Sequence, residues 1–160
     1  MHRASALTPS APFFGRHAER YRLSTPHTPR APKIARDFLV TLIGVQHPSL
    51  IEPGTLCMSE VVTNAIRHTR SPRIAIDVSI GDERVLVRVH DNRPCPLPAS
   101  RKPPHEEFEH GRGLALIEAH AARWGITFFG GLSPRSKAVW FELHETAETR
   151  GAGAIRTDLP

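Results

Sequence analysis

In the segment CMSEVVTNAIRHT, from Cys57 to Thr69, apolar residues recur every three or four positions. An α-helix turns by about 100° per residue, so residues three and four apart share a face. One face therefore carries the apolar residues Cys57, Met58, Val61, Val62, Ala65 and Ile66. The opposite face carries Glu60, Thr63, Asn64 and Arg67. The pattern predicts an amphipathic helix that packs on a core and exposes a polar stripe.

Glu60 and Asn64 are the residues of this stripe with the most useful chemistry. They lie one turn apart, so a carboxylate and a carboxamide project side by side. A carboxylate can take a proton from an attacking hydroxyl or water, and an amide oxygen is a hard ligand for Mg²⁺. Both functions are used in phosphoryl chemistry. An ordinary surface helix with a polar stripe is the alternative explanation of this segment.

The residues before this helix predict a tail, a strand and another helix. Residues 1–20 contain scattered Pro and Gly and predict a flexible tail. A short edge strand is expected at Tyr21–Ser24. A helix is expected at Ala31–Ile43, where apolar residues recur at helical spacing, and Gly44 follows as a stop.

After the Cys57–Thr69 helix the apolar period changes from helical to two. In residues 74–80 and 85–90, Ile or Val recurs at every second position on either side of a Gly81-Asp82 turn, which predicts a β-hairpin. Residues 94–110 contain five prolines and are too long for a simple turn. Loops of this length in a compact domain are usually functional lids or disordered.

A third helix and two further strands are predicted near the end of the chain. Gly111-Arg112-Gly113 opens the helix, and Gly125 closes it. Its core stripe consists of Leu114, Ile117, Ala121 and Trp124. Strands are expected at Ile126–Phe129 and Ala138–Leu143.

The element order β-α-α-β-β-α-β-β predicts an α+β fold. We expect a two-layer α/β sandwich, in which a mixed, mostly antiparallel sheet is covered on one face by helices. The domain should span residues 21–145, with a second flexible tail at residues 146–160. A chain of 160 residues with 39% hydrophobic residues is long enough for one such domain.

Composition excludes several classes of protein. The sequence contains no run of 18 apolar residues, so no membrane span is predicted. No apolar leader is evident. The two cysteines, Cys57 and Cys95, suggest no disulfide framework, so we expect a cytoplasmic protein. The charge is +5 with a pI of about 10.0, but the arginines are spread along the chain. This favours a solvated surface or an acidic protein partner over nucleic acid.

Asp91 continues the row of Val85, Val87 and Val89, the face that should pack on the helices. A buried unpaired carboxylate costs several kcal/mol, so this residue needs a donor. It could cap the turn that follows the strand. It could also await the N–H groups of a ligand, such as the exocyclic amine of adenine.

Gly111-Arg112-Gly113 is a third candidate motif. The free backbone N–H groups and the dipole at the start of a helix favour phosphate, and Arg112 adds a cation. Two glycines before a helix are common, so this motif is weak by itself. The chain contains no GxxxxGK[ST] motif, which excludes a P-loop.

Together and in this order, the three motifs resemble the conserved boxes of the GHKL (histidine kinase-like) ATPases. Ser59–His68 is similar to the N box, Val87–Asp91 to the G1 box and Gly111–Ile117 to the G2 box. The likeness covers about residues 20–145. It is strongest to the small bacterial anti-sigma factor serine kinases and regulatory ATP-binding proteins, and it implies the Bergerat/GHKL ATPase fold.

The resemblance also implies roles for individual residues. Glu60 would be the general base, Asn64 the Mg²⁺ ligand and Asp91 the acceptor of the adenine amine. Arg67 and His68, which close the N box, are assigned to nucleotide binding. The phosphates would be held by Gly111, Arg112, Gly113 and Leu114, with residues 94–110 as the ATP lid.

Two positions depart from the family pattern. The usual G1 box continues Asp-x-Gly-x-Gly, whereas this chain has Asp91-Asn92-Arg93-Pro94-Cys95. The late strand often carries a threonine near the adenine, and the residue that corresponds here is Ala138.

The resemblance implies an ATP- and Mg²⁺-binding serine/threonine kinase-like regulator of transcription. Its partners would be a sigma factor and an anti-anti-sigma factor, whose serine it would phosphorylate, and it would form a homodimer. One alternative is an inactive anti-sigma module that binds its partner with or without ATP. A basic nucleic-acid-binding regulator is the second alternative, and the scattered charge does not favour it.

Overall fold

The computed structural model describes residues 17–91, 113–130 and 136–147. Its elements follow the order β-α-α-β-β-α-β-β that the sequence predicts, with one added 3-10 turn at Pro48–Leu50. The helices are α1 (Ala31–Ile43), α2 (Ile51–His68) and α3 (Gly113–His120). The strands are β1 (Glu19–Pro26), β2 (Arg73–Ile80), β3 (Arg84–Asp91), β4 (Arg123–Phe129) and β5 (Ser136–His144).

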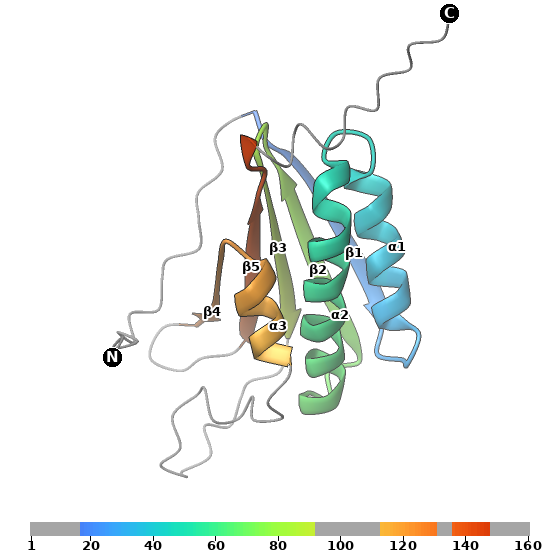
Figure 1. The fold of residues 1–160 in the computed structure, drawn as a ribbon. Helices are drawn as coiled ribbons and strands as arrows, with labels where there is room; N and C mark the ends of the chain where they lie inside the picture. The colour runs from blue at the N-terminus through green and yellow to red at the C-terminus, as the bar shows by residue number, and fades with distance from the viewer. Residues whose placement is uncertain (1–16, 92–112, 131–135, 148–160) are drawn as a thin grey trace, which may run out of the picture.

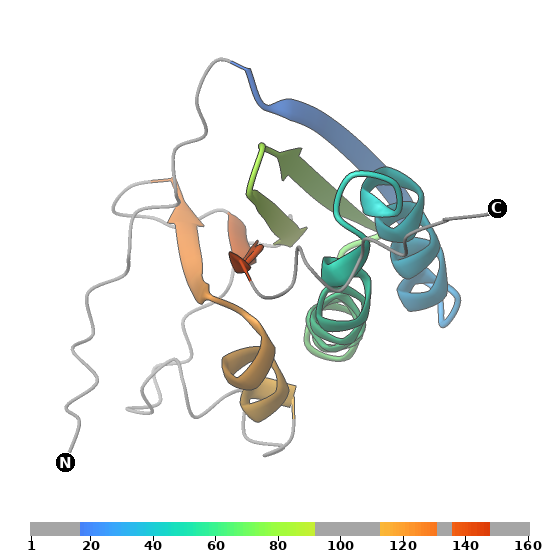
Figure 2. The same ribbon diagram turned by 45° about the horizontal axis from the view of Figure 1, so that its top comes forward.

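The strands form one sheet in the order β1-β2-β3-β5-β4, and the helices cover one of its faces (Figures 1 and 2). This confirms the predicted α+β sandwich. All four pairings are antiparallel. The described part of the sheet therefore contains none of the parallel pairing that a mixed sheet would have.

The core lies between the sheet and the helices, and α1, α2 and α3 all contribute to it. Cys57, Met58, Val61 and Val62 are buried, as the helical period predicts. They pack against the inner faces of the central strands, which carry Val85, Val87, Val89, Phe141 and Leu143. At about 25 cal/mol per Å² of buried apolar surface, this layer supplies the main stabilisation of the fold.

At Gly54, α2 comes close to both α1 and β5. A Cβ atom at this position would lie 3.1 Å from Leu39 Cδ2 of α1 and 3.1 Å from Leu143 Cδ1 of β5. The missing side chain therefore lets α2 lie against both α1 and the sheet.

Two helix boundaries differ from the prediction. α2 begins at Ile51, so Pro53 lies in its first turn, where the missing N–H breaks no helical hydrogen bond. α3 ends at His120 instead of reaching Trp124. Trp124 and Gly125 belong to β4, because the chain turns into the sheet at Ala122, whose N–H donates to Glu142 O at 2.8 Å. Trp124 still packs against the core, as predicted.

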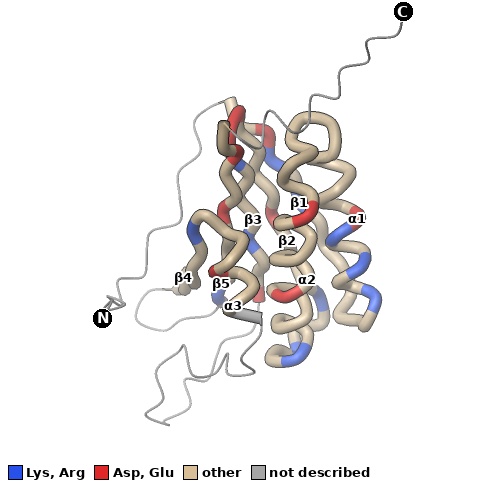
Figure 3. The backbone as a smooth tube through the Cα atoms, in the orientation of Figure 1, with Lys and Arg blue, Asp and Glu red and all other residues tan. Residues whose placement is uncertain are grey.

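Charged residues are distributed over the whole fold. Lys and Arg occur on strands and helices alike in the tube drawing (Figure 3). Among the described residues, no helix is both long and apolar enough to span a membrane.

Candidate functional site

The polar stripe of α2 lies on the flank that faces away from α1. Ser59 marks the α1 flank, because Arg36 Nη1 of α1 donates to its Oγ at 3.0 Å. Glu60 and Asn64 follow about 100° and 140° further round the helix, away from the flank that Arg36 contacts. Both residues are half-buried, which suits groups that contact a ligand. Arg67 and His68 are exposed in the last turn.

Asp91 is the last residue of β3 and is buried, with 7% of its surface exposed. It has the same strand parity as Val85, Val87 and Val89, which belong to the core cluster under the helices. The carboxylate is therefore on the helix-covered face, as the sequence predicts. An acid in this position requires hydrogen-bond donors.

The end of β3, the last turns of α2 and the start of α3 lie at the same end of the molecule (Figure 1). The sheet register explains this placement. β2 begins five residues after α2 ends, and Ala75 near its start is opposite His90 near the end of β3. The fold thus brings Asn64, Arg67 and His68 to the same end as Asp91.

The start of α3 supplies the third candidate motif in part. The helix begins at Gly113, with Leu114 as its second residue, so its first backbone N–H groups are unsatisfied within the helix. A helix start of this kind favours an anion. Gly111, Arg112 and the expected lid at residues 94–110 lie outside the described residues.

The C-terminal end of α2 is fixed by His27, which the sequence analysis did not single out. His27 Nε2 lies 2.9 Å from Ile66 O and 3.1 Å from Thr69 O. Both oxygens are carbonyl acceptors, so the ring nitrogen is the donor. Thr69 Oγ1 also donates to Ala65 O at 2.7 Å. The His27 contacts satisfy carbonyls at the helix end, whereas Ala65 O also accepts the backbone N–H of Thr69.

Ala138, the residue that the resemblance matches to the family threonine, does not lie opposite Asp91. Its Cα partner on β3 is His90, and it shares strand parity with Trp140 on the outer face of the sheet. Lys137 is the residue opposite Asp91. Ala138 thus lies one residue from the position opposite Asp91, and successive side chains of a strand point to opposite faces. The parity of Phe141 and Leu143 gives the face of Lys137 from sequence, but not its partner on β3.

The residues present are suited to an adenine nucleotide with Mg²⁺. A buried carboxylate at a strand end can accept hydrogen bonds from an amine, and a half-buried carboxamide can bind a hard cation. The start of a helix at the same end can receive phosphate. These three groups could therefore bind the base, the metal ion and the phosphates of such a ligand.

Comparison with known proteins adds one match. The family model described as the histidine kinase-like ATPase domain matches residues 25–126. That range contains α1, α2, β2, β3 and α3 with all the candidate site residues. A search of the curated proteins found no match.

Proposed function

Since the chain belongs to the histidine kinase-like ATPase family, we propose that it is an ATP- and Mg²⁺-dependent serine/threonine kinase-like regulator of the anti-sigma type. It would act as a homodimer in the cytoplasm. Its partners would be a sigma factor and an anti-anti-sigma factor, and the phosphate would be transferred to a serine of the latter.

The observation that carries the nucleotide part of this proposal is the position of Asp91. A nearly buried carboxylate closes the end of a central strand under the helical layer, at the same end as the polar stripe of α2. Burying an ionised group is costly unless it is hydrogen-bonded, so an acid at this point suits a polar role. The carboxylate would accept a hydrogen bond from a ligand amine.

Each residue of the site would have a distinct role. Asp91 would accept the hydrogen bond of the adenine amine, and Asn64 would bind Mg²⁺ through its amide oxygen. Glu60 would accept the proton of the serine hydroxyl. Bound ATP would supply the phosphoryl group, and its Mg²⁺ would offset the negative charge of the phosphates. Gly113 and Leu114 would contribute the backbone N–H groups at the start of α3.

The transfer step is tested with Glu60→Gln, which keeps the size of the side chain but removes the base. Phosphotransfer to a partner serine should fall by about 10²–10⁴, while ATP affinity stays close to wild type. Glu52→Gln, on an exposed position of the same helix, is the matched control and should transfer normally. Radiolabelled phosphate transfer and calorimetric titration measure the two quantities.

One feature favours a second candidate, an inactive anti-sigma module of the same fold. The segment after Asp91 lacks both glycines of the usual motif. If wild-type protein binds ATP and its partner but transfers no phosphate, this second function replaces the first.

A further inference from the structure

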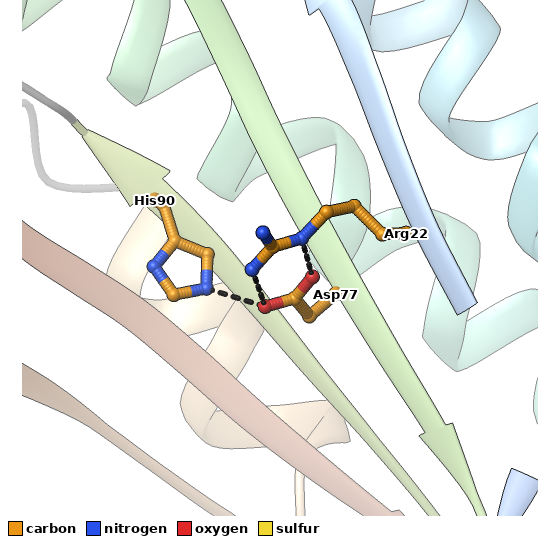
Figure 4. A network of polar contacts seen from close by, with 3 residues as sticks. All are labelled: Arg22, Asp77 and His90. Carbon is orange, nitrogen blue, oxygen red and sulfur yellow. Dashed lines mark hydrogen bonds and ion pairs between the residues drawn. The ribbon is translucent and has the colours of Figure 1, made fainter. Parts of the chain in front are cut away.

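A polar network connects three strands on the outer face of the sheet, the face without helices (Figure 4). Arg22 of β1 forms a two-pronged contact with Asp77 of β2, with Nε–Oδ1 and Nη2–Oδ2 distances of 2.6 and 2.8 Å. His90 of β3 lies on the other side of the carboxylate, with Nε2 at 2.8 Å from Oδ2. Asp77 thus receives donors from both neighbouring strands.

His90 is also held by an aromatic contact. Its ring stacks on Phe129 of β4, with centroids 5.9 Å apart and an angle of 30° between the planes. Its side chain is 17% exposed. The imidazole is therefore fixed by a hydrogen bond on one side and a ring contact on the other, and it joins strands from both halves of the sheet.

The ionisation of Asp77 strengthens its hydrogen bond with His90. The hydrogen bonds from Arg22 lower the pKa of the Asp77 carboxyl, and the nearby His90 lowers it further, although partial burial acts in the opposite direction. The carboxylate is therefore ionised at neutral pH. A bond between His90 and a charged acceptor is stronger than one between neutral groups.

The position of His90 along β3 gives the network a link to the site. The pairing between β2 and β3 runs from Ile80 opposite Val85 to Ala75 opposite His90. On its other side, β3 pairs with β5 one residue further, with Asp91 opposite Lys137. His90 is therefore the last residue paired on both sides, and Asp91 follows directly where pairing to β2 stops.

We infer that His90, held by Asp77 and Phe129, is a positioning residue for Asp91. Successive side chains of a strand point to opposite faces. When His90 is held on the outer face, the backbone orientation of the next residue is also held. The Asp91 side chain is then directed toward the helices. The network would reduce the freedom of the strand end, so that the Asp91 carboxylate is already oriented when nucleotide binds. This inference rests on the proposed adenine-binding role of Asp91.

The test compares a ligand that needs Asp91 with one that does not. His90→Leu removes the donor and replaces the imidazole with an apolar side chain of similar size. We expect Mg-ATP affinity to fall about 3- to 10-fold, because a displaced acceptor keeps only part of its hydrogen bond to the ligand. The affinity for Mg-tripolyphosphate, which has no base, should not change. Calorimetric titration gives both values.

Rescue and control variants separate positioning from general destabilisation. His90→Gln restores an N–H donor at a similar distance and should recover most of the ATP affinity. His144→Gln alters another histidine of the outer face, which contacts Glu142 at the far end of β5, and should leave both ligands unaffected. Equal losses for ATP and tripolyphosphate in His90→Leu, or no loss for either, would overturn the inference.

Two further variants keep the test conclusive. If His90→Leu does not fold, Arg22→Met on the exposed edge strand weakens the hold on Asp77 and should give a smaller loss in the same ATP-selective pattern. Asp91→Asn serves as the reference. If wild-type protein does not bind ATP, or if Asp91→Asn binds it unchanged, the proposed function fails. If only Asp91→Asn weakens ATP binding, the positioning role alone is wrong.

Discussion

Asp91 and His90 are neighbours on β3, yet they have opposite surroundings. Asp91 is buried on the face covered by helices, whereas His90 belongs to the polar network of the outer face. The alternation of a strand is sufficient to produce this difference. A ligand-binding residue and the residue that orients it can therefore be adjacent in sequence without touching each other.

Cys57 provides a second test at the residue scale. Its side chain is fully buried on the face of α2 that packs on the core, and this burial raises the pKa of the thiol to about 11. In a Cys95→Ser background, we expect native protein to resist a thiol reagent at pH 8 and to react fully after denaturation. Rapid labelling of the native protein would contradict the packing of α2.

The same thiol predicts a pH dependence of stability. An unfolded cysteine ionises near pH 8.5–9, whereas the folded one keeps its proton up to about pH 11. The stability due to the protonated thiol is therefore complete below about pH 8.5 and declines as pH rises through this window. Chemical denaturation between pH 8 and pH 11 should show a steeper decline for Cys95→Ser than for Cys57→Ala/Cys95→Ser.

At the scale of elements, the placement of α2 depends on a glycine. Gly54→Val should destabilise the protein by about 1–3 kcal/mol, because its branched side chain would press on Leu39 and Leu143. Thr55→Val introduces the same side chain one residue later, at a half-buried position of α2, and should change stability much less. Urea denaturation of the two variants gives the comparison. Similar stabilities would show that α2 does not approach α1 and β5 as closely as described.

Much of the molecule could be predicted from its apolar periods. The helical period identified the buried face of α2, and the strand period placed Asp91 on the inner face. These features are local, since each depends on residues within one element. The end of α3 could not be predicted in this way, because Trp124 fits the core stripe of a helix and also the inner face of β4.

The features that sequence did not reveal depend on pairing between distant segments. Lys137 lies opposite Asp91 only through the register of β3 and β5. The Arg22–Asp77 contact joins residues 55 positions apart, and neither residue belongs to a recognisable motif. Such pairs follow from the order of strands in the sheet, which a single sequence does not specify.

The central claim is that Asp91 recognises adenine, and calorimetric titration of ATP and GTP tests it most directly. Wild-type protein should prefer ATP. Asp91→Asn replaces an acceptor oxygen with a donor, so ATP affinity should fall by about 5- to 150-fold, the range that corresponds to 1–3 kcal/mol for an unpaired buried group. GTP affinity should change much less. Equal binding of ATP and GTP by the wild type, or unchanged ATP affinity in Asp91→Asn, would contradict the claim.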